Sequence, residues 1–256
     1  MFYLYSHHMD SHLIKYVNGL VGQYYQTPGN KKLVVWIGWA PSRPSSPDKE
    51  AMMVSESGFD LIRPEFYGYS RSAWIFSPKN CIQTIYDNEE ILTPVYDEIV
   101  MVWHSYGGWI AAAMPKFDET IKEIVLLAPW FAPDNLNELW YPEETDEEFL
   151  RQCLLWYKHI YRFEDGIDPY DGLINLWELN PIKNLSHLSD TKIFIWHGTG
   201  DDVIWSGRSK KFVEQLKELN PHGNYHYAEY YGLWHGGICK EAGLKWRLHR
   251  RKQFNS

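Results

Sequence analysis

Residues 98–113, EIVMVWHSYGGWIAAA, decide the fold of this chain. A run of apolar strand formers leads to His104 and Ser105, and two glycines and an alanine-rich segment follow. An apolar run of this kind predicts a buried strand, and the residues after the glycines favour a helix. The stretch therefore predicts a strand, a tight turn and a helix, with Ser105 at the tip of the turn.

The same stretch resembles the nucleophile elbow, G-x-S-x-G, in which a tight turn presents the serine hydroxyl clear of the sheet. Ser105 and Gly107 fit this pattern, whereas Trp103 stands where the first glycine is expected. A serine at the end of a strand is also a common cap of the following helix. This stretch alone leaves Ser105 open as either a nucleophile or a helix cap.

Two later stretches place an acid and a histidine in similar positions. Residues 192–203, KIFIWHGTGDDV, read as an apolar strand followed by a glycine-bearing loop that contains Asp201. Residues 230–237, YYGLWHGG, place His235 just after another strand-like run. Ser105, Asp201 and His235 follow the chain order of α/β-hydrolase triads, and each falls where a predicted strand ends.

These loops carry a family resemblance. Residues 105–108 (SYGG) together with residues 197–202 (HGTGDD) are similar to the catalytic domain of the prolyl oligopeptidase and dipeptidyl-peptidase family, within the α/β-hydrolase superfamily. The resemblance covers roughly residues 30–250 and implies an α/β-hydrolase fold with a mostly parallel central sheet flanked by helices. It implies Ser105 as nucleophile, Asp201 as acid and His235 as base. Because the large N-terminal propeller of those peptidases is lacking, their peptidase activity does not transfer with the fold.

The first central strand lies within residues 31–41 and runs into a polar, proline-rich loop at residues 42–47. In α/β-hydrolases the loop after this strand donates one oxyanion-hole N–H, and the residue after the nucleophile donates the other. We therefore expect the N–H groups of Trp39 and Tyr106 to form the oxyanion hole. The alternative is that Gly38 and Pro41 simply turn the chain.

Further strands and helices are expected around this centre. Residues 13–17 and 22–25, joined through Asn18-Gly19, predict an antiparallel hairpin at the sheet edge. Asn80 and Ser206 are the expected caps of two helices. Further strands are expected at residues 59–63, 123–127 and 225–230. Asp134, which follows the second of these, is the alternative triad acid.

Residues 134–188 break the alternation of strands and helices. A capping box at residues 145–148 precedes apolar residues at helical spacing, which predicts a small helical cap inserted over the strand ends. The cap is either a lid that shapes substrate choice or a helix packed rigidly on the flank. The chain as a whole, residues 1–256, is expected to form one domain.

Composition narrows the function classes. The chain has 256 residues, 45% of them hydrophobic and 16% aromatic, and its net charge of −8 argues against general affinity for nucleic acid. Three cysteines without C-x-x-C spacing suggest neither a zinc site nor a disulfide framework. Neither a signal peptide nor an apolar run long enough to cross a bilayer is recognised, so a cytoplasmic protein without membrane insertion is expected.

The expected reaction is acyl transfer to water through an acyl-enzyme, which requires no metal or organic cofactor. A small-molecule carboxylic ester is the first substrate class, and a short peptide or aryl amide is the second. A catalytically silent hydrolase fold that serves as a binding module is the remaining alternative, and Trp103 in the elbow is the feature that favours it.

Overall fold

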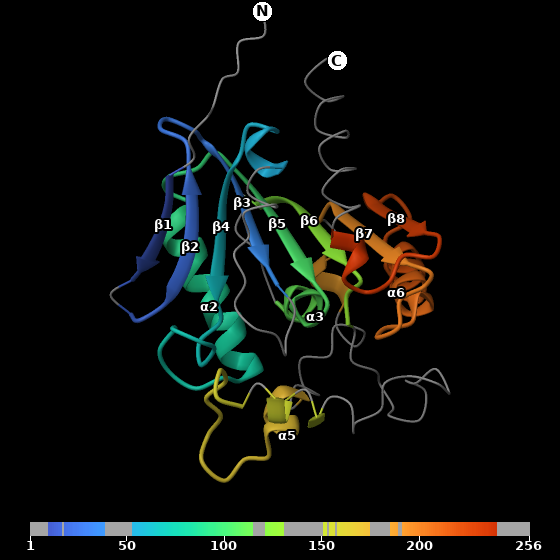
Figure 1. The fold of residues 1–256 in the computed structure, drawn as a ribbon. Helices are drawn as coiled ribbons and strands as arrows, with labels where there is room; N and C mark the ends of the chain where they lie inside the picture. Colours follow the sequence, from blue (N-terminus) through green and yellow to red (C-terminus); the bar gives the residue numbers. More distant parts are fainter. Residues whose placement is uncertain are drawn as a thin grey trace, which may run out of the picture.

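One sheet of eight strands runs through the molecule, in the order β1-β2-β4-β3-β5-β6-β7-β8 (Figure 1). The computed structural model describes residues 10–16, 18–38, 53–114, 121–130, 151–152, 154–156, 158–174, 185–188 and 191–239. β1 pairs antiparallel with β2, and β2 pairs antiparallel with β4. The pairs from β4 and β3 through to β8 are all parallel. The mostly parallel sheet and the antiparallel edge hairpin are confirmed.

The strands agree with the apolar and alternating runs of the sequence. Their bounds are Asp10–Lys15 (β1), Val21–Gln26 (β2), Lys32–Ile37 (β3), Asp60–Glu65 (β4), Glu98–His104 (β5), Ile121–Leu127 (β6), Ile193–Gly198 (β7) and Tyr225–Tyr230 (β8). The central strands β3, β5 and β7 are buried along almost their whole length. Burial on both faces is why their sequences are continuously apolar rather than alternating.

Helices connect the strands, and two of their caps differ from expectation. The helices whose bounds the structure describes are α2 (Pro78–Leu92), α3 (Tyr106–Ala113), α5 (Pro169–Ile174), α6 (Ser206–Leu219) and the short 3-10 helix η3 (Leu185–Leu188). Asn80 was the wrong cap for α2, because Pro78 starts the helix earlier and the Ser77 side chain accepts from the Asn80 N–H at 3.2 Å. Ser206 is likewise the first residue of α6, and Trp205 holds the cap position without a side-chain hydrogen bond.

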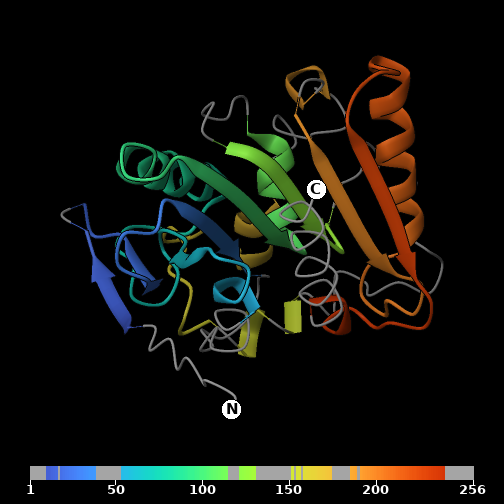
Figure 2. The ribbon, with the colours of Figure 1, turned by 90° about the horizontal axis from the view of Figure 1, so that it is seen from above.

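Two hydrophobic layers lie on the two faces of the sheet. On one face, side chains of α2, α3 and α6 pack against alternate residues of the central strands, among them Ile37, Met101 and Trp103. The other face buries the intervening strand residues, such as Val100 and Val102, with Val54 and Ile238 from outside the sheet. Figure 2 shows α2, α3 and α6 on the same side of the sheet. Within the described ranges, no helix is both long and apolar enough to cross a membrane.

The described part of the predicted cap is fastened to the loop between β4 and α2. The Ser70 N–H donates to the Ile160 carbonyl at 2.7 Å, and the Phe76 N–H donates to the Arg162 carbonyl at 2.6 Å. The Arg162 N–H donates in turn to the Gly68 carbonyl at 2.8 Å. These bonds hold residues 160–162 against that loop. Residues 134–150 and 175–184 lie outside the described part of the chain, so a helical cap over 134–188 stays a prediction.

Candidate active site

Ser105 occupies a sharp turn between β5 and α3. Its backbone has φ 56° and ψ −121°, a conformation that non-glycine residues rarely adopt and that costs on the order of 1–3 kcal/mol. Backbone bonds on both sides hold it there. The Ser105 N–H donates to the Leu127 carbonyl at 3.0 Å, and the Ser105 carbonyl accepts from the N–H groups of Gly108 and Trp130, each at 2.9 Å. The turn has the strained geometry that the nucleophile-elbow pattern predicts.

The Ser105 hydroxyl is not used as a helix cap. The side chain makes no capping hydrogen bond to α3, although Ser105 directly precedes that helix. The residue is 5% exposed. The structure therefore gives no support to the alternative in which Ser105 only caps the helix.

The two glycines after the turn let α3 come close to the neighbouring strand ends. A Cβ on Gly107 would lie 3.0 Å from Ile37 Cγ2 and 3.1 Å from the Gly38 carbonyl oxygen, which is tighter than ordinary contact. A Cβ on Gly108 would lie 2.5 Å from Pro129 Cβ. The start of α3 is thus wedged between the ends of β3 and β6, where a larger residue would force the backbone apart.

Trp103 does not prevent the elbow from forming. It pairs in register with Ile37 on one side and Leu126 on the other, and its side chain is fully buried in the layer beneath α2 and α3. The large side chain that replaces the first glycine of the motif packs within the core on one face of the sheet, because successive strand residues point to opposite faces. The strained backbone at Ser105 coexists with a tryptophan two residues earlier.

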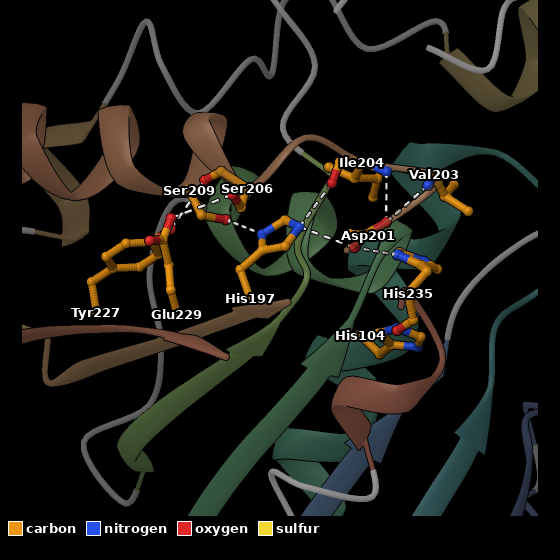
Figure 3. A network of polar contacts seen from close by, with 10 residues as sticks. All are labelled: His104, His197, Asp201, Val203, Ile204, Ser206, Ser209, Tyr227, Glu229 and His235. Atoms are coloured by element: carbon orange, nitrogen blue, oxygen red, sulfur yellow. Dashed lines mark hydrogen bonds and ion pairs between the residues drawn. The ribbon is translucent and has the colours of Figure 1, made fainter. Parts of the chain in front are cut away.

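Asp201 and His235 are in contact, although 34 positions separate them in the chain. Asp201 follows β7 and His235 follows β8, and the two strands pair in parallel, so both residues leave the same edge of the sheet. His235 Nδ1 lies 2.8 Å from Asp201 Oδ2 (Figure 3). The other carboxylate oxygen, Oδ1, accepts the N–H groups of Val203 at 2.9 Å and Ile204 at 2.8 Å. The carboxylate is therefore fixed in orientation and directed at the imidazole.

The protein environment keeps this carboxylate ionised. Burial on its own raises the pKa of Asp201, but hydrogen bonds from His197 and His235 lower it by more, and the net pKa lies below the ordinary value. An ionised acceptor at Nδ1 requires the proton of the His235 imidazole to sit on that nitrogen. Nε2 is then the nitrogen able to take a proton from a hydroxyl.

His104 connects the elbow to the loop that carries His235. Its ring centroid lies 4.7 Å from that of His235, and its Nε2 lies 3.2 Å from the His235 carbonyl oxygen. Burial, and next the proximity of His235, hold the pKa of His104 well below its usual value, so the ring is neutral and donates this bond. Because His104 immediately precedes Ser105, the contact brings the nucleophile candidate and the His235 loop to the same end of β5.

Other predicted site residues fare differently. Tyr106 begins α3 directly after Ser105, and its role as an oxyanion-hole donor stays a prediction. Its ring is buried against the rings of Phe66 and Trp130, and this packing holds the start of α3 in place. Trp39 and Asp134 lie outside the described residues, and their assignments stay predictions. Within the part of the chain that the structure describes, no cluster of three or more metal-ligating side chains occurs.

Sequence reasoning missed His104, His197 and Ser209, which surround the predicted acid and base. His197 lies 3.0 Å from Asp201 Oδ2 through its Nε2, and its Nδ1 lies 2.8 Å from Ser209 Oγ. A usable signal was present for His197, which opens the HGTGDD stretch that contains Asp201. No local pattern marks Ser209, because only tertiary packing of α6 brings it to β7.

Comparison with solved structures gives the fold. The chain is similar to DcsB in complex with its substrate analogue, at a TM-score of 0.71 and 11% identity, over 95% of this chain and 99% of that one. It is also similar to an esterase of Pyrococcus furiosus, at 0.64 and 14% over 94% and 90%, and to an epoxide hydrolase of Vigna radiata, at 0.62 and 14% over 96% and 98%.

No protein-family model matches the chain, and no curated protein matches its sequence. The structural likeness thus extends over nearly the whole described architecture without close sequence identity, and it does not single out the prolyl oligopeptidase type. The sheet order, the elbow and the solved neighbours together establish that this chain has the α/β-hydrolase fold.

Proposed function

We propose that this protein is a serine hydrolase that cleaves carboxylic esters through an acyl-enzyme. The observation that carries the proposal is the strained turn at Ser105, placed at the sheet edge where Asp201 is hydrogen-bonded to His235. Maintaining a non-glycine residue at positive φ has a cost, and such strain is concentrated at functional sites. The esterase among the structural neighbours supports an ester as the first substrate class.

In the proposed reaction, Nε2 of His235 takes the Ser105 proton as the hydroxyl oxygen attacks the ester carbonyl. Asp201 holds the imidazole in the tautomer that leaves Nε2 basic, and it stabilises the imidazolium that forms. The imidazolium then gives its proton to the leaving alcohol as the C–O bond breaks. Water, activated by the same imidazole, releases the acid from Ser105. No metal or organic cofactor is needed for these steps.

The negative charge on the tetrahedral intermediate needs hydrogen-bond donors close to its oxygen. We assign this role to the backbone N–H groups of Tyr106 and Trp39. The first lies at the start of α3, where the helix dipole adds favourable potential for an anion. Loss of one such donor costs about 2.7–4 kcal/mol in the barrier.

Labelling with a fluorophosphonate probe tests the assignment of Ser105. Wild type should be labelled and Ser105→Ala should not, because the probe reacts only with an activated hydroxyl. Ser55→Ala is the matched control, since this serine precedes β4 at the opposite end of the parallel strands, and its labelling should equal that of wild type. Wild type that stays unlabelled, or labelling that survives Ser105→Ala, would refute an active Ser105.

The substrate class is tested separately with acyl p-nitrophenyl esters and aminoacyl amides under the same conditions. Ester cleavage should dominate. Dominant cleavage of the amides would replace the ester assignment by a peptidase of short peptides, with the triad unchanged.

A further inference from the structure

His197 touches the carboxylate of the predicted triad from the side opposite to His235. It lies in β7, is completely buried, and places Nε2 3.0 Å from Asp201 Oδ2 (Figure 3). His235 Nδ1 reaches the same oxygen at 2.8 Å. One carboxylate oxygen therefore receives two imidazole groups, while Oδ1 is occupied by two backbone N–H groups.

The hydrogen-bond partners of His197 fix where its proton lies. Nε2 is within 3.0 Å of two acceptors, Asp201 Oδ2 and the Ile204 carbonyl oxygen. Neither acceptor has a proton to offer, so Nε2 must carry the hydrogen and share it between them. Nδ1 is then the side that faces the hydroxyl of Ser209, at 2.8 Å. Ser209 is completely buried in α6, and it can donate to this nitrogen.

We propose that His197 is a positioning residue of the triad, which holds Asp201 by a second imidazole N–H bond and limits how strongly the carboxylate attracts the proton of His235. This proposal rests on the proposed function of Ser105, Asp201 and His235. It assigns to His197 no contact with substrate. Ser209 is the residue that keeps His197 in the required tautomer.

The physical effect has a definite sign. An N–H donor on a carboxylate stabilises its charge and weakens its attraction for other protons. With His197 in place, Asp201 attracts the imidazole proton less strongly than a carboxylate without this donor would. Removing the donor should therefore strengthen the attraction of Asp201 for the imidazole proton and move the acid limb of the kcat/KM profile to higher pH.

Other titratable groups lie near His197 and His235. His104, from the end of β5, faces His235, and its lowered pKa keeps it neutral. Glu229 and Tyr227 of β8 lie beyond Ser209, on the far side of His197 (Figure 3). The Tyr227 hydroxyl donates to Glu229 at 2.7 Å, and Ser206 Oγ lies 3.3 Å from the same carboxylate oxygen. Apart from His235 itself, His197 is the described side chain that hydrogen-bonds to Asp201, so its removal changes the hydrogen bonding of the carboxylate directly.

The experiment compares His197→Leu with His197→Gln. The glutamine amide carries its N–H at the same bond count from Cβ as the imidazole Nε2 and does not titrate, so it can keep the bond to Asp201. We expect His197→Leu to lose about 10- to 100-fold in kcat/KM. The acid limb of its kcat/KM profile should move upward by about half to one pH unit. His197→Gln should restore most of the lost kcat/KM and bring the acid limb most of the way back to its wild-type pH. His222→Gln, at an exposed histidine outside this network, is the control and should match wild type.

A purely structural role would lower the amount of active protein without moving the pH profile. Unshifted acid limbs in both variants would therefore overturn the proposal, and so would a glutamine variant that behaves like leucine. Probe labelling of wild type is run beside these assays. An unlabelled wild type would refute the proposed function, whereas a labelled wild type with unshifted variants would refute only the role of His197.

Nitrogen-15 NMR of the histidine side chains of wild type tests the same idea even where His197→Leu does not fold. The spectrum should show a proton on Nε2 of His197 and a proton on Nδ1 of His235. A His197 imidazole that carries its only ring proton on Nδ1 would contradict the proposed bond to Asp201. This measurement needs no activity, so it is independent of the assignment of Ser105.

Discussion

Replacing Trp103 by glycine restores the sequence motif of the elbow and should nevertheless damage the protein. The side chain is fully buried and is among the largest in the core. Truncating a buried tryptophan costs about 3–5 kcal/mol, and glycine in a strand adds about 0.5–1 kcal/mol. A total of about 3.5–6 kcal/mol approaches the whole stability of a typical domain, about 5–15 kcal/mol.

Urea unfolding measures this loss of stability. Fluorophosphonate labelling of the folded protein measures how reactive Ser105 is in the elbow. Trp103→Gly should unfold about 2 M earlier in urea, taking a slope of about 2–3 kcal/mol per molar. Its labelling per folded molecule should not exceed that of wild type, since the strained Ser105 backbone already exists beside the tryptophan.

The matched control is a pair of tryptophans changed to alanine. Trp156 is 63% exposed, so Trp156→Ala should change stability by no more than about 0.5 kcal/mol. Trp103→Ala should instead lower the stability by several kcal/mol. A Trp103→Gly variant that is as stable as wild type and is labelled faster would refute the reasoning. Trp103 would then be an obstacle to the elbow rather than part of its support.

Two further substitutions probe the site. Asp201→Asn should lower kcat by about 10⁴-fold, because an amide permits the wrong tautomer of His235; a decrease below tenfold would contradict a triad role. The pKa of Asp201 is lowered in the folded state, so the ionised carboxylate stabilises the fold at pH values above its unfolded pKa, which is near 4. This stabilisation is lost as the pH falls further. The urea midpoint of Asp201→Asn should therefore change less with acid pH than that of wild type. Gly108→Ala should lower the free energy of unfolding by about 1–3 kcal/mol, because the added methyl group would collide with Pro129. An unchanged urea midpoint would count against this close packing of Gly108 on Pro129.

Much of the fold was predictable because local sequence patterns, formed by neighbouring residues in the chain, indicate its strands and turns. The continuous apolar runs of β3, β5 and β7 indicate strands buried on both faces, and that is how they lie. Asn18-Gly19 indicated the edge hairpin that β1 and β2 form. The missed cap of α2 was also local, because Pro78 after Ser77 marks a helix start that outweighs a later asparagine.

The site was only partly predictable. Ser105, Asp201 and His235 each follow a strand in a recognisable loop, so their types and order pointed to one edge of a parallel sheet. Their supporting residues carry no comparable pattern. His104 reaches the His235 carbonyl across 131 positions, and His197 depends on Ser209 from another element.

The sequence by itself determined the alternation of strands and helices and the sharp turn at Ser105, and it predicted Ser105, Asp201 and His235 as the triad. Tertiary structure alone decided that the Trp103 side chain is absorbed by the core, and that two imidazoles share one carboxylate oxygen of Asp201. The reason is physical. Periodicity and turn chemistry act between near neighbours in the chain, whereas hydrogen bonds and packing in the interior depend on distances that only the folded chain sets.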